Sequence, residues 1–262
     1  MYKRQGVYFG NATPAGGGEN TGTVNNAGVF SSDSRALNID GSGLTVNNTG
    51  QIIGTGDQRN GTVYADSTAQ DFTLNNQAGG VIDASSGNLG AGFSVELSEA
   101  GNNFDINNEG IIQGRGDAGA GVATAGDGIR LERERVAGAL DGATTGLFTG
   151  TITNSGTIAS EGANGTVGGF RAVNGVSFQG TLNNEAGGTI SGTQNGVYFG
   201  NATPAGGGEN TGTVNNAGVI SSDSRALNID GTGLTVNNTG QIIGTGDQRN
   251  GTVYPDLSLI HI

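Results

Sequence analysis

The acidic side chains have the clearest potential for chemistry in this chain. Asp33 and Asp40, with their repeats Asp223 and Asp230, offer paired carboxylates. Glycoside hydrolysis requires two such groups about 5 to 9.5 Å apart. Residues 6–255 contain neither Lys nor His, so a general base there has to be a carboxylate or an Arg. We expect these carboxylates to be solvated corner charges, and we predict no catalytic residue.

A second candidate is a receptor motif. Arg115, Gly116 and Asp117 form the tripeptide that integrin receptors bind. The tripeptide falls in the longest interval between repeats, where a loop should project. The competing interpretation is an incidental loop, because Gly-rich corners need no partner. We keep these three residues as the candidate receptor-binding site.

The sequence contains no complete motif for a metal or phosphate site. The segments 39–43 and 54–57 resemble calcium-binding turns, but they lack the tandem nine-residue Gly-Gly-x-Gly-x-Asp spacing. Gly-rich phrases such as 16–18 have no strand-to-helix context in which to hold a phosphate. We therefore predict no metal and no cofactor.

The composition excludes several classes of protein. Of 262 residues, 53 are Gly. Collagen is excluded because Pro is scarce and Gly does not fall at every third position. A long coiled coil is excluded because Gly is a poor helix former. No apolar run is long enough for a membrane-spanning helix. The net charge of −12 would repel a phosphate backbone, so we predict no nucleic-acid partner.

The organisation along the chain has three parts. Residues 1–5 and 256–262 match nothing else in the chain and resemble translated sequencing-adaptor read-through, so we expect both to be non-native. The span 6–255 is then one repetitive domain, with a loop excursion near 113–147. Inside that excursion, 130–140 breaks the apolar pattern of a strand, and we expect a solvated segment in preference to a short helix.

Repeats occur on two scales. Residues 6–64 recur at 196–254, an offset of 190, with only Phe30 changed to Ile220 and Ser42 changed to Thr232. On the fine scale, a phrase with the pattern β-branched residue or Leu, Asn or Thr, Asn, spacer, Gly, one residue, Ile recurs eight times. Its second Asn falls at Asn26, Asn48, Asn76, Asn108, Asn154, Asn184, Asn216 and Asn238.

The spacing of the phrases selects a solenoid. The shortest step between these Asn residues, from Asn26 to Asn48, suits one coil of three short strands and is too short for two helices. Longer steps are the same coil with loops at a corner. We predict that the eight Asn side chains stack at one corner as a hydrogen-bonded ladder, because aligned amides lie about 4.8 Å apart in stacked strands.

Three apolar columns should face the interior. Two phrases carry two extra residues before Ile82 and Ile190, and an insertion of two keeps those side chains on the same face of a strand. The first column is Val24, Val46, Leu74, Ile106, Ile152, Leu182, Val214 and Val236. The second is Phe30, Ile52, Ile82, Ile112, Ile158, Ile190, Ile220 and Ile242. The third is Leu37/Ile39, Val63, Phe93/Val95, Ile129/Leu131, Val197/Phe199, Leu227/Ile229 and Val253.

Two phrases resemble a known family. Thr181-Leu-Asn-Asn-Glu-Ala-Gly-Gly-Thr-Ile190 and Gly150-Thr-Ile-Thr-Asn-Ser-Gly-Thr-Ile158 are similar to the β-helical passenger domains of bacterial autotransporters and related secreted adhesins. The resemblance implies a surface or released protein of a Gram-negative bacterium, exported across the outer membrane and covalently continuous with a C-terminal outer-membrane β-barrel. A lack of Cys is compatible with that route.

These observations together predict an all-β protein. We expect a single right-handed parallel β-helix with three short strands per coil and about eight coils. Its expected role is that of a non-catalytic adhesive stalk or display scaffold at the cell surface, with a host-cell surface, an abiotic surface or a glycan as partner. The competing prediction is a polysaccharide lyase or glycoside hydrolase on the same fold.

Overall fold

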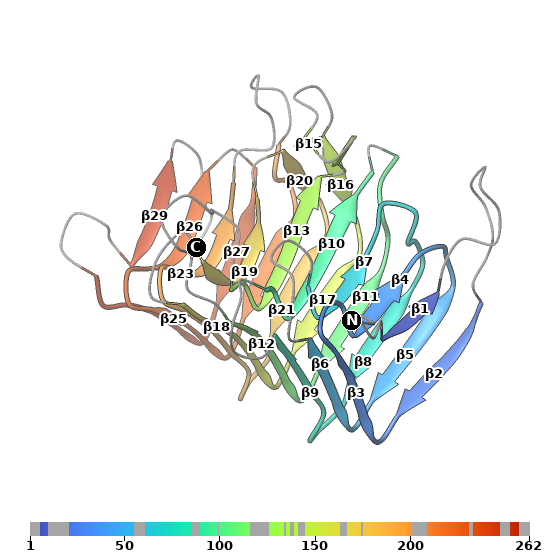
Figure 1. The fold of residues 1–262 in the computed structure, drawn as a ribbon. Helices are drawn as coiled ribbons and strands as arrows, with labels where there is room; N and C mark the ends of the chain where they lie inside the picture. Colours follow the sequence, from blue (N-terminus) through green and yellow to red (C-terminus); the bar gives the residue numbers. More distant parts are fainter. Residues whose placement is uncertain are drawn as a thin grey trace.

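The computed structural model describes most of the chain as stacked strands (Figure 1). All regular elements within the described residues are β-strands, and none of those residues belongs to a helix long and apolar enough to span a membrane. The described residues are 6–9, 21–54, 61–84, 90–98, 100–115, 126–133, 135–136, 139–140, 145–162, 167–173, 175–200, 209–230, 233–246 and 252–256.

Three parallel sheets form the three faces of a right-handed β-helix, as predicted, and each coil contributes one strand to each sheet. Sheet A contains β1 (Val7–Phe9), β4 (Leu37–Ile39), β7 (Val63–Ala65), β10 (Phe93–Leu97), β13 (Ile129–Arg133), β19 (Gly168–Ala172), β23 (Asn195–Phe199), β26 (Arg225–Asp230) and β29 (Val253–Asp256). Sheet B contains β2 (Gly22–Asn26), β5 (Leu44–Asn48), β8 (Thr73–Asn76), β11 (Asp105–Asn108), β17 (Thr151–Asn154), β21 (Thr181–Asn184), β24 (Thr213–Asn216) and β27 (Thr235–Asn238). Sheet C contains β3 (Val29–Ser32), β6 (Gln51–Gly54), β9 (Val81–Ala84), β12 (Ile111–Arg115), β18 (Thr157–Glu161), β22 (Thr189–Gly192), β25 (Val219–Ser222) and β28 (Gln241–Gly244).

Two smaller pairs lie outside these sheets. The strands β16 (Gly146–Phe148) and β20 (Val176–Phe178) pair in parallel, while β14 (Arg135–Val136) and β15 (Ala139–Leu140) form an antiparallel pair. The pair β14 and β15 directly follows β13, so the interval between two coils here holds a short hairpin.

The register confirms the inward columns. Ile106 pairs with Leu74 on one side and Ile152 on the other, and all three are fully buried. The same residue-over-residue pairing runs through the second column, including Ile82 and Ile190. The prediction that two inserted residues preserve the facing of these side chains is therefore correct.

The inserted residues are accommodated in turns. Gly79 and Gly187 have positive φ angles of 86° and 91°, a left-handed conformation that favours Gly. The amide nitrogens of Gly80 and Gly188 then donate to the carbonyl oxygens of Gln77 and Glu185, at 2.8 and 2.9 Å. The extra residues thus close on themselves and leave the strand register unchanged.

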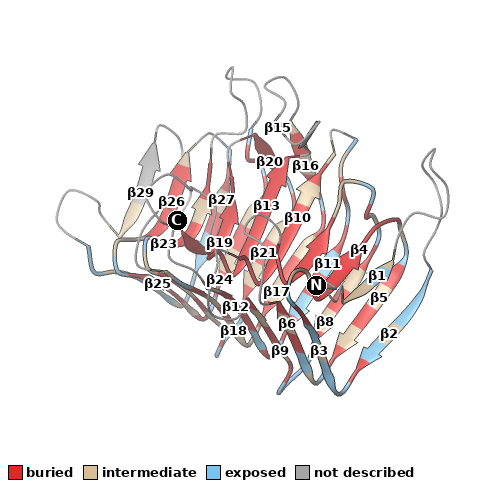
Figure 2. Ribbon diagram, viewed as in Figure 1, coloured by how far each residue is buried: buried red, intermediate tan, exposed pale blue. Residues whose placement is uncertain are grey.

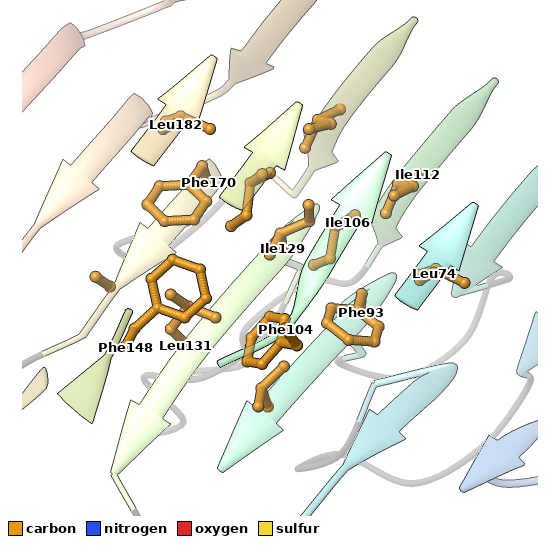
Figure 3. Close-up of a cluster of buried hydrophobic side chains, with 14 of the residues drawn as sticks. Leu74, Phe93, Phe104, Ile106, Ile112, Ile129, Leu131, Phe148, Phe170 and Leu182 are labelled. Atoms are coloured by element: carbon orange, nitrogen blue, oxygen red, sulfur yellow. The ribbon is translucent and has the colours of Figure 1, made fainter. Parts of the chain in front are cut away.

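Aromatic rings complete the core, and Figure 3 labels four of them, Phe93, Phe104, Phe148 and Phe170. Phe72 stacks on Phe104 with ring centroids 4.6 Å apart, Phe104 contacts Phe148 at 4.8 Å, and Phe148 stacks on Phe178 at 5.1 Å. This column was not predicted from the sequence, and neither was Phe170, which pairs with Ile129 in the third column. A visible signal existed, because in four coils a Phe stands one to three residues before the first residue of the sheet B strand, which is Thr73, Asp105, Thr151 or Thr181.

Burial of the apolar columns is what holds one coil on the next (Figure 2). A single coil buries almost nothing by itself, since its inward side chains contact those of the coils above and below. Each fully buried Val, Leu or Ile contributes about 1.5 to 3 kcal/mol before the entropy of ordering is subtracted.

We predict that Ile106→Asp destabilises several neighbouring coils by about 3 to 5 kcal/mol, because it places an unpaired carboxylate in a fully buried column. Thr181→Asp is the matched control, since Thr181 lies on the outward side of the same sheet and is only half-buried. Limited proteolysis and thermal unfolding measure both variants. Equal protease resistance of Ile106→Asp and the parent chain would contradict the assignment of the column.

Candidate functional site

The eight predicted Asn residues lie in one line at the corner between sheets B and C. Each side-chain nitrogen Nδ2 donates to the Oδ1 oxygen of the next residue along the stack, at 2.7 to 2.8 Å. The residues in order are Asn26, Asn48, Asn76, Asn108, Asn154, Asn184, Asn216 and Asn238. Asn108 also donates to the carbonyl oxygen of Thr157 at 3.0 Å, so the amide links two coils twice.

A second Asn column, on the outer face of sheet B, was not predicted as a ladder. Here the donors point the opposite way, as in Asn75 to Asn47 at 2.8 Å and Asn107 to Asn75 at 2.9 Å. The amide dipoles of the two columns therefore oppose each other. Thr153 interrupts the outer column, because it occupies the register position between Asn107 and Asn183.

The receptor tripeptide is only partly described. Arg115 is the last residue of β12, whereas Gly116 and Asp117 lie outside the described residues. The guanidinium group of Arg115 donates to Asp83 at 2.7 Å and to Glu161 at 2.8 Å, one partner on each neighbouring coil. These contacts raise the pKa of Arg115, chiefly through the hydrogen bond to Asp83. A receptor would have to displace both carboxylates to bind this side chain.

The carboxylates Asp33 and Asp40 differ in exposure. Asp33 follows β3 and is exposed, whereas Asp40 follows β4 and is only 6% exposed, so the expectation of a solvated corner charge is wrong for Asp40. Asp40 instead contacts Asp66 of the next coil and the hydroxyl group of Tyr8. Burial, followed by the hydrogen bond and charge of Asp66, raises the pKa of Asp40 to about 6, while the hydrogen bond from Tyr8 opposes the shift.

The second copy of the repeat reproduces the contact between the Tyr and Asp side chains. The hydroxyl group of Tyr198 donates to Asp230 at 2.9 Å. Burial, together with the charge of Asp230, raises the pKa of Tyr198 to about 12. A Tyr hydroxyl on a carboxyl group thus recurs on the outer face of sheet A, once in each copy of the repeat.

An ion-pair network on β13 and β19 contradicts the expectation of a solvated segment for residues 130–133, while the side chains of 134–140 lie outside the described ones. Arg130 and Arg171 both contact the carboxylate of Asp127, at 3.4 and 3.2 Å, and Arg130 also contacts Glu132 at 3.1 Å. All four side chains are buried. The inward facing of Ile129 and Leu131 was predicted, whereas the burial of the outward Arg130 and Glu132 between them was not.

The outer face of sheet A therefore carries many charged side chains, and those of Asp127, Arg130, Glu132 and Arg171 form ion pairs with one another. Asp40 and Asp66 interact, because the hydrogen bond and charge of Asp66 help to raise the pKa of Asp40. Within the described residues, no three His, Cys, Asp or Glu side chains gather as a metal site.

The fold and these surfaces define a three-sheet parallel β-helix with one internal Asn ladder and a largely self-paired charged face. Comparisons of the chain with protein-family models, with curated proteins and with solved structures each find no match. Its function therefore has to be inferred from the stacked fold, the 190-residue repeat and the outer surface.

We predict that Asn108→Ala destabilises the stack by about 2 to 3 kcal/mol, because it leaves buried donors and acceptors of two coils without partners. Asn107→Ala removes an exposed amide one position earlier and should cost less than about 1 kcal/mol. Thermal unfolding followed by circular dichroism compares the two. Equal losses of stability in the two variants would show that the inner ladder contributes no more than the outer column.

The raised pKa of Asp40 predicts a pH dependence of the N-terminal coils. The folded state holds this proton up to about pH 6, whereas the ordinary pKa is 3.8. The stabilisation is therefore fully present below about pH 4 and is lost as the pH rises through about 6. Asp40→Asn should remove this loss, as measured by hydrogen exchange of β4 amides at pH 5 and pH 7. The same pH dependence in both chains would contradict the assignment.

Proposed function

We propose that this chain is a rigid, non-catalytic rod segment of a bacterial cell-surface or secreted protein of the autotransporter type. In this role the coils hold loops or neighbouring domains away from the cell, and the long side faces contact a host-cell or abiotic surface, or a glycan. The proposal combines the resemblance of the repeat phrases with the physical properties of the stack.

One observation carries the proposal: identical sequences are buried inside the stack and exposed at its ends. Val214 is fully buried, while Val24, its counterpart in the first copy of the repeat, is only partly buried on the first coil. In the other direction, Asn48 is fully buried, whereas Asn238 on the last complete coil is exposed. The same residues are thus fully buried in one copy and more exposed in the other.

A repeated interface of this kind favours extension. The apolar columns of the first and last coils match an interface that already exists between coils of the same sequence. A long repeat that carries several whole coils therefore suits a rod of variable length better than a single compact site.

The outer surface also supports a scaffold. The buried charges of sheet A are engaged with each other, as in the contacts of Asp127 with Arg130 and Arg171. The competing function is a polysaccharide lyase or glycoside hydrolase, and the raised pKa of Asp40 is the observation that favours it. The interactions of Asp40 with Asp66 and Tyr8 argue against hydrolysis, because these partners already engage its carboxyl group.

A turnover assay separates the two functions. The purified chain is incubated with neutral and acidic polysaccharides, and the release of shorter products is measured by chromatography. We expect no product above that of the Asp40→Asn variant. Product release by the parent chain that is lost in Asp40→Asn would overturn the proposal in favour of the enzyme.

Extension of the rod is a second prediction. When a copy of residues 65–195 is appended directly after Tyr254, the additional coils should stack in register on the last one. Small-angle scattering should then show an unchanged cross-section and a length greater by about 4.8 Å for each coil added. As a control, the same residues in scrambled order should increase the radius of gyration without keeping the cross-section of a rod.

A further inference from the structure

A shallow open groove of about 280 Å³ runs along the outside of sheet C. Its floor includes Ser191, Ser221 and Ile243, which are stacked in register on three successive coils. Its volume lies just below the usual range of small-molecule sites, about 300 to 1,000 Å³. The groove also reaches Ser160 on the preceding coil, so it extends across four coils, or about 14 Å along the axis.

Hydroxyl groups dominate the lining of this groove. Thr193 and Thr245 join the Ser side chains, and Asp223 supplies the one carboxylate among the lining residues. A hydroxyl group both donates and accepts hydrogen bonds, whereas a carboxylate only accepts. The lining is therefore complementary to a ligand whose own groups are mostly hydroxyls, and Ile243, which is 42% exposed, offers an apolar contact for the C–H face of a ring.

A buried hydroxyl group in the groove has no partner. The Oγ atom of Ser160 makes no hydrogen bond, although the residue is only 6% exposed. By contrast, the neighbouring Ser222 hydroxyl accepts from the amide of Ser224 at 3.0 Å, and the Thr193 hydroxyl donates to the carbonyl oxygen of Gly162 at 2.7 Å. Because the Ser160 Oγ atom is fully buried on the inward side of β18, a ligand in the groove meets the outward hydroxyl groups of Ser191 and Ser221 instead.

We propose that this groove binds a short neutral oligosaccharide lying along the helix axis, with successive sugar rings facing successive coils. The single carboxylate of Asp223 accepts hydrogen bonds from sugar hydroxyls. That carboxylate and the net charge of −12 both disfavour a uronate or sulfated chain. This ligand would be the binding partner of the proposed scaffold. Binding is measured on the chain alone, so its outcome is independent of whether added coils extend the rod.

The internal duplication supplies matched controls. Ser31 and Asp33 have the same local sequence as Ser221 and Asp223 but do not line the groove. Isothermal titration calorimetry with gluco-, xylo- and manno-hexaoses, and with galacturonate hexaose, measures binding to the parent chain. We expect at least one neutral hexaose to bind, and at least tenfold more tightly than the galacturonate.

The variants test the position of the ligand. Ser221→Tyr, which fills the groove from an outward position, should weaken binding at least tenfold, and Asp223→Asn should weaken it several-fold. Ser31→Tyr and Asp33→Asn should leave the affinity within twofold of the parent value. The proposal is overturned by absence of binding to every neutral hexaose, by tighter binding of the galacturonate, or by equal effects in the two matched pairs.

Discussion

The structure depends on each coil lying directly over the next, in register, at the spacing of hydrogen-bonded strands. This single constraint requires like residues to touch like residues along the axis. It explains the fully buried column through Ile106, the Asn ladder through Asn108, and the aromatic stack through Phe104. It also explains the corner glycines, since a Cβ atom on Gly110 or Gly156 would lie 2.2 Å from a carbonyl oxygen of the coil below. Stability in such a stack is shared between neighbours, so no coil has a core of its own.

The same constraint separates the inside from the outside. Inward positions have to repeat, because a change in one coil alters its contacts with two others. Outward positions on sheets A and C do not have to repeat from coil to coil, and there the sequence varies. On sheet A, Ser94 of β10 pairs in register with Arg130 of β13. On sheet C, β12 ends at Arg115. Recognition therefore belongs to the outward positions, as the hydroxyl-lined groove of sheet C illustrates, while the interior supplies rigidity. A rod with a constant interior and a variable surface suits display on a cell surface better than catalysis at one point.

Particular residues show how far the sequence could be interpreted. The spacing of the Asn residues and the alternation of apolar residues predicted the coils, the three inward columns and the facing of Ile82 and Ile190. The sequence analysis failed where one coil departs from the others. The charged segment after Gly128 was taken as a solvated excursion because Arg and Glu broke the expected composition, yet Arg130 and Glu132 are buried in β13. The interaction between Asp40 and Asp66 was also not foreseen, although the two residues directly follow Ile39 and Ala65, which pair in register on β4 and β7.

The sequence by itself determined the fold class, because a short period with Val, Leu or Ile at fixed places and Asn at the corner is satisfied by one kind of stack. It also determined which faces point inward, because the side chains of a strand alternate between its two faces. Only the tertiary structure decided which outward side chains form ion pairs, since Arg115 reaches Asp83 as well as Glu161, its partner in register, and Asp127 is reached by Arg130 and Arg171. The inward pattern is periodic and can be detected along one chain, whereas the outward ion pairs depend on which of several neighbours a long side chain reaches.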